Sequence, residues 1–165
     1  MSQNNILVDF DGTARIAGLG SAFISTQNDN TSSELDTEAP SYGTAPELVF
    51  PTPLESVIQT TKESDIYAFG LLAWEASHFT LPFKHSLKRT NPQIFAGHVP
   101  FPWIHPFGAV YSLTNGDRPP RPSHPDLSDR VWNMIERCWE KNPSLRPPIK
   151  TVVDILEEHT PTFDV

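Results

Sequence analysis

Apolar residues gather in two short runs at the start of the chain, at residues 5–9 and 13–17, and both are rich in Ile, Leu and Val. Phe10-Asp11-Gly12 lies between them. Because Asp-Gly tolerates the positive φ of tight turns, this pattern predicts a β-hairpin in which Asp9 and Asp11 are turn residues. Residues 25–44 are polar and lack periodicity, which indicates a surface loop.

The spacing of apolar residues becomes helical farther along the chain. Residues 62–77 carry them at mixed three- and four-residue steps, which predicts a buried helix with Ser64 or Asp65 as its N-cap. Residues 79–125 are rich in proline and aromatic residues and suit a loop around a short helix at 107–114.

Two more helices are predicted near the end of the chain. Ser128 is a good N-cap for the first, which should end at Pro143. Its apolar face should comprise Val131, Ile135, Cys138 and Trp139. The second should run over 148–158 with Ile149, Val152, Val153, Ile155 and Leu156 as its apolar residues. The predicted fold class is therefore mainly α, of α+β type, with strands only in the N-terminal hairpin.

Composition narrows the possible functions. The 165 residues suffice for one sizeable core, and a net charge of −8 argues against nucleic acid as a partner. The longest apolar run, residues 67–74, is too short to cross a bilayer, and no secretion signal is visible at the start. Cys138 is the single cysteine, which excludes an internal disulfide. We therefore expect a cytoplasmic domain without membrane partners.

The stretch from Ile6 to Thr13 resembles the first motif of the HAD-superfamily phosphatases. That resemblance implies that Asp9 would attack phosphorus and that Asp11 would act as acid and base. The family also needs a downstream Lys or Arg and an acidic pair, set within alternating strands and helices. Gly116-Asp117 is the only counterpart of the pair, and no such alternation follows Ile16. The phosphatase is a remote alternative.

Five further motifs stand in one order along nearly the whole chain. They are Asn5-Ile6-Leu7-Val8, Gly18-Leu19-Gly20, Ala45-Pro46-Glu47, Ser64-Asp65-Ile66-Tyr67-Ala68-Phe69-Gly70, and Gly116-Asp117-Arg118-Pro119 followed by Cys138-Trp139, Asn142-Pro143 and Arg146-Pro147. They resemble the end of the catalytic loop, the Asp-Phe-Gly position, the Ala-Pro-Glu motif, the opening of the central helix and the domain end of protein kinases, in tyrosine-kinase-like style. The resemblance implies the large lobe of a kinase with a residual hairpin.

The resemblance also implies chemistry and structural roles. By family, the chain would transfer phosphate from ATP, with Mg²⁺, to Ser, Thr or Tyr of a protein substrate. Asn5 matches the Asn that holds a magnesium ion. Glu47 and Arg146 match the partners of a buried ion pair. Asp65 matches an Asp that accepts hydrogen bonds from catalytic-loop backbone.

The sequence departs from the kinase pattern at the metal site. Gly18 offers no side-chain ligand where the Asp of Asp-Phe-Gly is expected, so Asn5 alone would contribute a neutral oxygen. In the pattern H-R-D-x-x-x-x-N the catalytic Asp would precede Met1. We therefore expect residues 1–160 to be a partial kinase domain with no catalytic or nucleotide-binding residue, followed by a tail at 161–165.

Two interpretations of function follow from this departure. In one, a longer parent chain supplies the missing N-terminal lobe and the whole is an enzyme, while the chain as given is inactive. In the other, the chain is a pseudokinase-type module that binds a protein partner. In either case the apolar surface of residues 5–17 should lie uncovered.

Residues 76–93 interrupt the kinase pattern. Joining Glu75 directly to Ile94 gives GLLAWEIFAGHVPF, which matches the family better and continues an apolar helix end. We therefore interpret residues 76–93 as an in-frame insertion, with a natural loop as the alternative.

Overall fold

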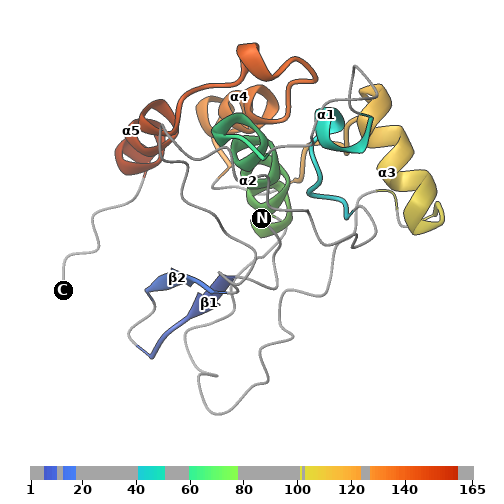
Figure 1. Cartoon of the computed structure of the whole chain (residues 1–165). Coiled ribbons are helices and arrows are strands. Elements are labelled where there is room, and N and C mark those ends of the chain that lie inside the picture. Colours follow the sequence, from blue (N-terminus) through green and yellow to red (C-terminus); the bar gives the residue numbers. More distant parts are fainter. Residues whose placement is uncertain are drawn as a thin grey trace.

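The computed structural model describes residues 6–10, 13–17, 41–50, 60–77, 101, 103–123 and 127–159. Its elements, in chain order, are β1 (Ile6–Val8), β2 (Ala14–Ile16), α1 (Pro46–Val49), α2 (Lys62–Ala76), α3 (Pro106–Asn115), α4 (Asp129–Cys138), the 3-10 helix η4 (Pro143–Leu145) and α5 (Ile149–His159). Helices predominate, and the strands form one antiparallel hairpin near the N-terminus (Figure 1). The predicted fold class is confirmed.

Helix α2 lies at the centre of the helical body (Figure 1) and contacts α4, which in turn contacts α5. Side chains of α2 and α4 fill the core. Its fully buried members include Tyr67, Leu113, Met134, Ile135, Cys138, Trp139 and Val152. Trp132 and Trp139 meet edge to face at 5.8 Å, an arrangement that aromatic rings prefer.

Glycine 70 allows α2 to approach α4 closely. A Cβ atom added at Gly70 would lie 2.9 Å from the Cβ of Cys138 and 3.3 Å from the backbone nitrogen of Trp139. The first distance is shorter than carbon atoms tolerate, so a side chain at this position would push the two helices apart. The core is therefore built around a residue with no side chain.

Helix α2 begins at Lys62, as predicted, but its N-cap lies about one turn before the predicted one. Its N-cap is Thr61, whose hydroxyl accepts from the Ser64 backbone N–H, while the Ser64 hydroxyl accepts from the Thr61 N–H. This capping box satisfies two donors at the helix start. The prediction of Ser64 or Asp65 as N-cap was wrong, because Ser64 occupies the third helical position of a box that Thr61 opens.

Both helices predicted near the end of the chain are present, but the end of one and the buried face of the other differ from the prediction. Ser128 caps α4 as predicted, accepting from Val131 N–H, but the helix ends at Cys138 rather than Pro143. Trp139 leaves helical geometry, and its carbonyl accepts from Arg118. Of the apolar residues predicted for α5, only Val152 is buried, while Ile149 is 58% exposed. One face of α5 therefore remains apolar and open.

The hairpin pairs Ile6 with Ile16 and Val8 with Ala14, and the Asp9 N–H donates to the Thr13 carbonyl at 3.0 Å. In Figure 1 it stands apart from the helices. Leu7 is 48% exposed and Ile16 59%, so the expectation of uncovered apolar surface is met at these positions. No helix among the described residues is long and apolar enough to cross a membrane.

Candidate functional site

The turn of the hairpin holds the first residue for which chemistry was considered. The Asp9 carboxylate accepts from the Thr13 backbone N–H at 3.0 Å and from Arg15 Nε at 2.6 Å. Both of its oxygens are thereby engaged in holding the turn. Asp9 thus acts as a turn residue. The two described strands form an antiparallel hairpin, whereas the phosphatase family has strands that alternate with helices.

A magnesium site is not formed by the residues that the structure describes. Within them no group of three or more His, Cys, Asp or Glu side chains is placed to hold a metal ion. Asn5, predicted as a metal ligand, lies outside the described residues, as do Asp11 and Gly18. The predicted insertion is described only at residues 76 and 77, where α2 ends. The role of Asn5 as a magnesium ligand therefore stays a prediction.

The best-defined charged group of the helical body is the pair of Glu47 and Arg146. Arg146 donates from Nη1 to Glu47 Oε1 at 2.7 Å and from Nη2 to Glu47 Oε2 at 2.8 Å. The Arg146 side chain is fully buried, and that of Glu47 is 27% exposed. Two parallel bonds between a guanidinium and a carboxylate are both strong and geometrically specific. The contact that the kinase resemblance implied is present.

Arg146 also binds backbone from two other elements. Its Nε donates to the Glu140 carbonyl and its Nη1 to the Glu63 carbonyl, both at 2.8 Å. Its guanidinium lies 5.0 Å from the centre of the Tyr67 ring. Because a buried charge is tolerated only when its donors are satisfied, this network explains how Arg146 can be buried. One side chain thereby joins α1, the start of α2 and the segment after α4.

The buried ring of Tyr67 contacts two arginines. Besides Arg146, Arg118 lies 5.8 Å from the ring centre. Burial raises the pKa of the Tyr67 phenol, while Arg118 and Arg146 oppose that shift. Among the described residues its hydroxyl has no hydrogen-bond partner. The phenol is therefore neutral, and the ring serves as a packing surface for two guanidinium groups.

Asp65 lies in the first turn of α2 and is exposed. The sequence predicted that its carboxylate must find water or a partner other than the catalytic-loop backbone that the kinase resemblance implies. Among the described residues this carboxylate accepts no hydrogen bond, and its exposure leaves it to water. An acidic residue in the first turn still interacts favourably with the helix dipole.

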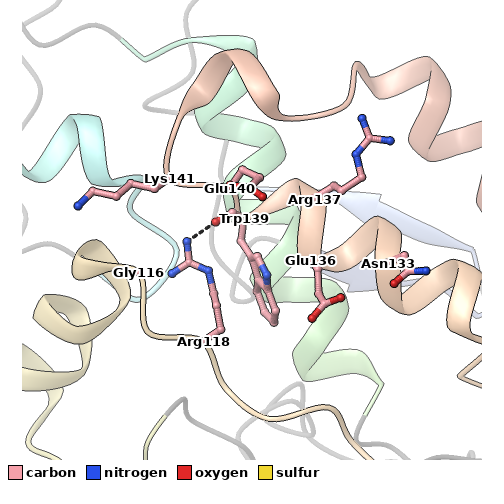
Figure 2. A pocket seen from close by; sticks show the side chains of 8 residues that line it. All are labelled: Gly116, Arg118, Asn133, Glu136, Arg137, Trp139, Glu140 and Lys141. Carbon is pink, nitrogen blue, oxygen red and sulfur yellow. Dashed lines mark hydrogen bonds between the residues drawn. The ribbon is translucent and has the colours of Figure 1, made fainter.

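An open cleft of about 570 Å³ lies between the end of α3 and the exposed side of α4 (Figure 2). Arg118 forms part of its wall, and its guanidinium donates to the carbonyls of Leu113, Asp117 and Trp139. Burial lowers the pKa of Arg118. Since its N–H groups hold three carbonyls of the protein itself, Arg118 links α3 to α4 rather than presenting a binding site. The sequence placed Arg118 in a motif but gave no sign of this role.

Comparison with known proteins identifies the family of this chain. The chain matches the family described as protein tyrosine and serine/threonine kinase over residues 1–156. It is 26% identical over 160 residues to the serine/threonine/tyrosine-protein kinase HT1 of Arabidopsis thaliana, covering 96% of this chain and 34% of that protein. It is 28% identical over 158 residues to platelet-derived growth factor receptor beta of Homo sapiens, covering 95% of this chain and 12% of the receptor.

A third relative is the dual specificity protein kinase shkC of Dictyostelium discoideum, 23% identical over 159 residues. The alignment covers 95% of this chain and 26% of that kinase. The chain thus spans about a third or less of the length of these relatives, and nearly all of it lies within the match. The family match extends over both the hairpin and the helical body that Glu47 and Arg146 hold together. The chain belongs to the protein tyrosine and serine/threonine kinase family.

Proposed function

We propose that this chain is a kinase-family large lobe that lacks phosphoryl-transfer activity and works by binding another protein. The observation that carries the proposal is Gly18, which stands where the family has the Asp of Asp-Phe-Gly. Phosphoryl transfer depends on positioning and on neutralisation of charge by magnesium, which prefers carboxylate oxygens. Glycine has none, and Asn5 supplies only a neutral amide oxygen.

The contacts that hold the helical body support a binding role. The Glu47–Arg146 pair, the capping box of α2 and the Arg118 hydrogen bonds are all formed. The ion pair and the Arg118 hydrogen bonds join one helix to another, and the capping box fixes the start of α2. A chain that keeps its internal supports and loses a metal ligand at Gly18 suits a module whose surface, rather than its catalytic site, is in use. A cytoplasmic location belongs to the same proposal.

Nucleotide binding and phosphate transfer test the proposal directly. The purified chain is melted with and without ATP and Mg²⁺, and is incubated with labelled ATP and casein. A nucleotide at a hundred times its dissociation constant would add about 2.7 kcal/mol of stability, a shift of several degrees. We expect no shift and no labelled casein. Transfer that disappears in Asn5→Ala would overturn the proposal, because it would show a working metal site.

A second candidate is an active kinase in which this chain is one part. The short share of the relatives' lengths that the chain covers favours it. The whole protein would then transfer phosphate from ATP to Ser, Thr or Tyr of a protein substrate, as the family does. Sequencing the coding region upstream of Met1 distinguishes the candidates. An open frame that encodes His-Arg-Asp and a lysine-bearing small lobe supports the kinase, and a stop codon supports the binding module.

A further inference from the structure

Helix α3 is apolar on two opposite sides. Its sequence, PFGAVYSLTN, contains no charged residue. Ala109, Val110 and Leu113 are buried against the core at 8% exposure or less. Phe107 and Tyr111, one turn apart, are 65% and 60% exposed. A surface helix normally presents polar residues on its outer side, so a second apolar side indicates a surface that another molecule covers.

Trp103 lies in the turn before α3, three residues ahead of Pro106, and it is 73% exposed. We call Trp103, Phe107 and Tyr111 the α3 aromatic face. Large aromatic residues of this kind dominate the binding energy of protein interfaces.

The structure holds the start of the α3 aromatic face in a fixed shape. Phe101 packs against the core and meets Trp103 edge to face at 5.9 Å. A hydrogen bond of 2.9 Å from Ile104 N–H to the Phe101 carbonyl closes the turn between them. Phe101 has a φ of 54°, a backbone conformation that residues other than glycine rarely adopt.

Two further contacts fix the helix start. The ring of His105 stacks on that of Phe107 at 5.7 Å, with 11° between the planes. Ile104 packs so closely on α3 that a Cβ at Gly108 would lie 2.5 Å from it. Backbone strain such as that at Phe101 concentrates at functional sites, and a rigid surface loses less entropy when it binds. The α3 aromatic face is therefore preorganised.

We propose that the α3 aromatic face binds a short segment of another protein that is apolar on one side and carries Lys or Arg beside it. Three aromatic side chains, exposed by roughly two thirds, offer on the order of 400 Å². A stable dimer needs about 800 Å² on each partner, so the face is too small for a second copy and suits a short segment.

Charge points to the same partner. The chain has a net charge of −8, so two copies repel each other whereas a basic segment is attracted. Aromatic rings also attract cations at their faces. This inference deepens the proposed binding role by naming the partner's chemistry. Its experiments measure the binding of a segment at α3, whereas the tests of the proposed function measure nucleotide binding and phosphate transfer. Either proposal can therefore fail while the other holds.

Trp103 provides the first test. The chain has four tryptophans, and the other three, Trp74, Trp132 and Trp139, are at most 9% exposed. Acrylamide should therefore quench a red-shifted component of the fluorescence that Trp103→Phe lacks. If Trp103 is already protected in the isolated chain, its own residues or a second copy cover the face, and the proposal is overturned.

Binding provides the second test. A phage-displayed library of random 12-residue peptides is selected on the immobilised wild-type chain, and the enriched peptides are synthesised with a fluorescent label. We expect apolar residues with Lys or Arg nearby, and at least tenfold weaker binding to Phe107→Ser/Tyr111→Ser. The matched control is Leu145→Ser/Ile149→Ser, which removes residues of 57% and 58% exposure and should bind like wild type.

Three results would overturn the inference. The library could yield no peptide that binds the wild-type chain, or the two double variants could bind equally. Sedimentation could also show a wild-type dimer that Phe107→Ser dissociates, which would make the occupant a second copy. Circular dichroism of each variant ensures that a loss of binding is not a loss of folding.

Discussion

The hairpin and the helical body each contain an ion pair, and the two pairs are of nearly equal length but differ in burial. Arg15 and Asp9 are 2.6 Å apart in the hairpin, and Arg146 and Glu47 are 2.7 Å apart in the body. The carboxylates are equally exposed, at 25% and 27%. The arginines differ, since the Arg15 side chain is 66% exposed and the Arg146 side chain is fully buried. Burial of the cation, rather than distance, therefore separates a turn contact from a structural support.

The same difference holds for the surroundings of each pair. Arg146 binds carbonyls of Glu63 and Glu140 and packs on Tyr67, so its removal leaves several groups without partners. The hairpin makes its main contacts within itself, and Phe10 at its turn is fully exposed. Two-stranded hairpins are marginal in water on their own. Stability should therefore reside in the helical body, and the hairpin should change with little consequence for it.

The largest expected effect comes from Arg146→Ala. Removing one partner of a buried ion pair leaves the other uncompensated, which costs about 3–5 kcal/mol of unfolding free energy. Urea unfolding followed by tryptophan fluorescence measures the loss. The control is Arg130→Ala, which breaks an exposed pair with Glu158 and should cost at most about 1 kcal/mol. An unchanged urea midpoint for Arg146→Ala would remove the basis of the comparison.

Glu75 makes the helical body sensitive to pH. Burial raises the pKa of Glu75 from its ordinary value of 4.5 to about 7, so the folded chain binds this proton more tightly than the unfolded chain. Its contribution to stability is fully present below pH 4.5 and is lost as the pH rises through 7. The loss is on the order of 2–3 kcal/mol. Melting from pH 5 to 8 should therefore show wild type falling relative to Glu75→Gln, and parallel curves would refute this.

Gly70→Ala tests the close contact of α2 and α4. The added Cβ meets the Cβ of Cys138 at 2.9 Å, and overpacking of a core costs about 1–3 kcal/mol. The better helix propensity of alanine returns about 1 kcal/mol. We expect a net loss of about 1–2 kcal/mol in urea unfolding. A more stable variant would mean that the helices separate easily and that the body is less rigid than its packing suggests.

The smallest effect is expected in the hairpin. Arg15→Ala breaks an exposed ion pair and should change the unfolding free energy of the helical body by less than about 1 kcal/mol. Circular dichroism at 222 nm, which follows the helices, is the measurement. A loss as large as that of Arg146→Ala would show that the hairpin and the helical body unfold as one unit.

Local patterns in the sequence predicted the helices well and their ends less well. The apolar steps of residues 62–77 placed α2 within one residue of its observed end, and Ser128 was correctly identified as a cap. The start of α2 at Lys62 was predicted correctly, but its cap was missed because Thr61 and Ser64 both carry hydroxyls, and only their mutual hydrogen bonds decide which one is the cap. The end of α4 was missed because Arg118, a distant residue, binds the carbonyl of Trp139.

The charged network could not be found from local spacing. Glu47 and Arg146 are 99 positions apart, and no helical or strand periodicity connects them. The order of motifs along the whole chain predicted their contact because it carries information on the fold as a unit. The metal role of Asn5 stays a prediction, since Asn5 lies outside the described residues.

The single cysteine of the chain has a practical consequence for experiments. Cys138 is fully buried, and burial raises the pKa of its thiol to about 12, so it is neither accessible nor ionised at neutral pH. A cysteine introduced at Tyr111 or at Leu145 would then be the one thiol that reacts readily with maleimide dyes. The natural sequence is thus already suited to site-specific labelling, and distances across the molecule can be measured without first removing a cysteine.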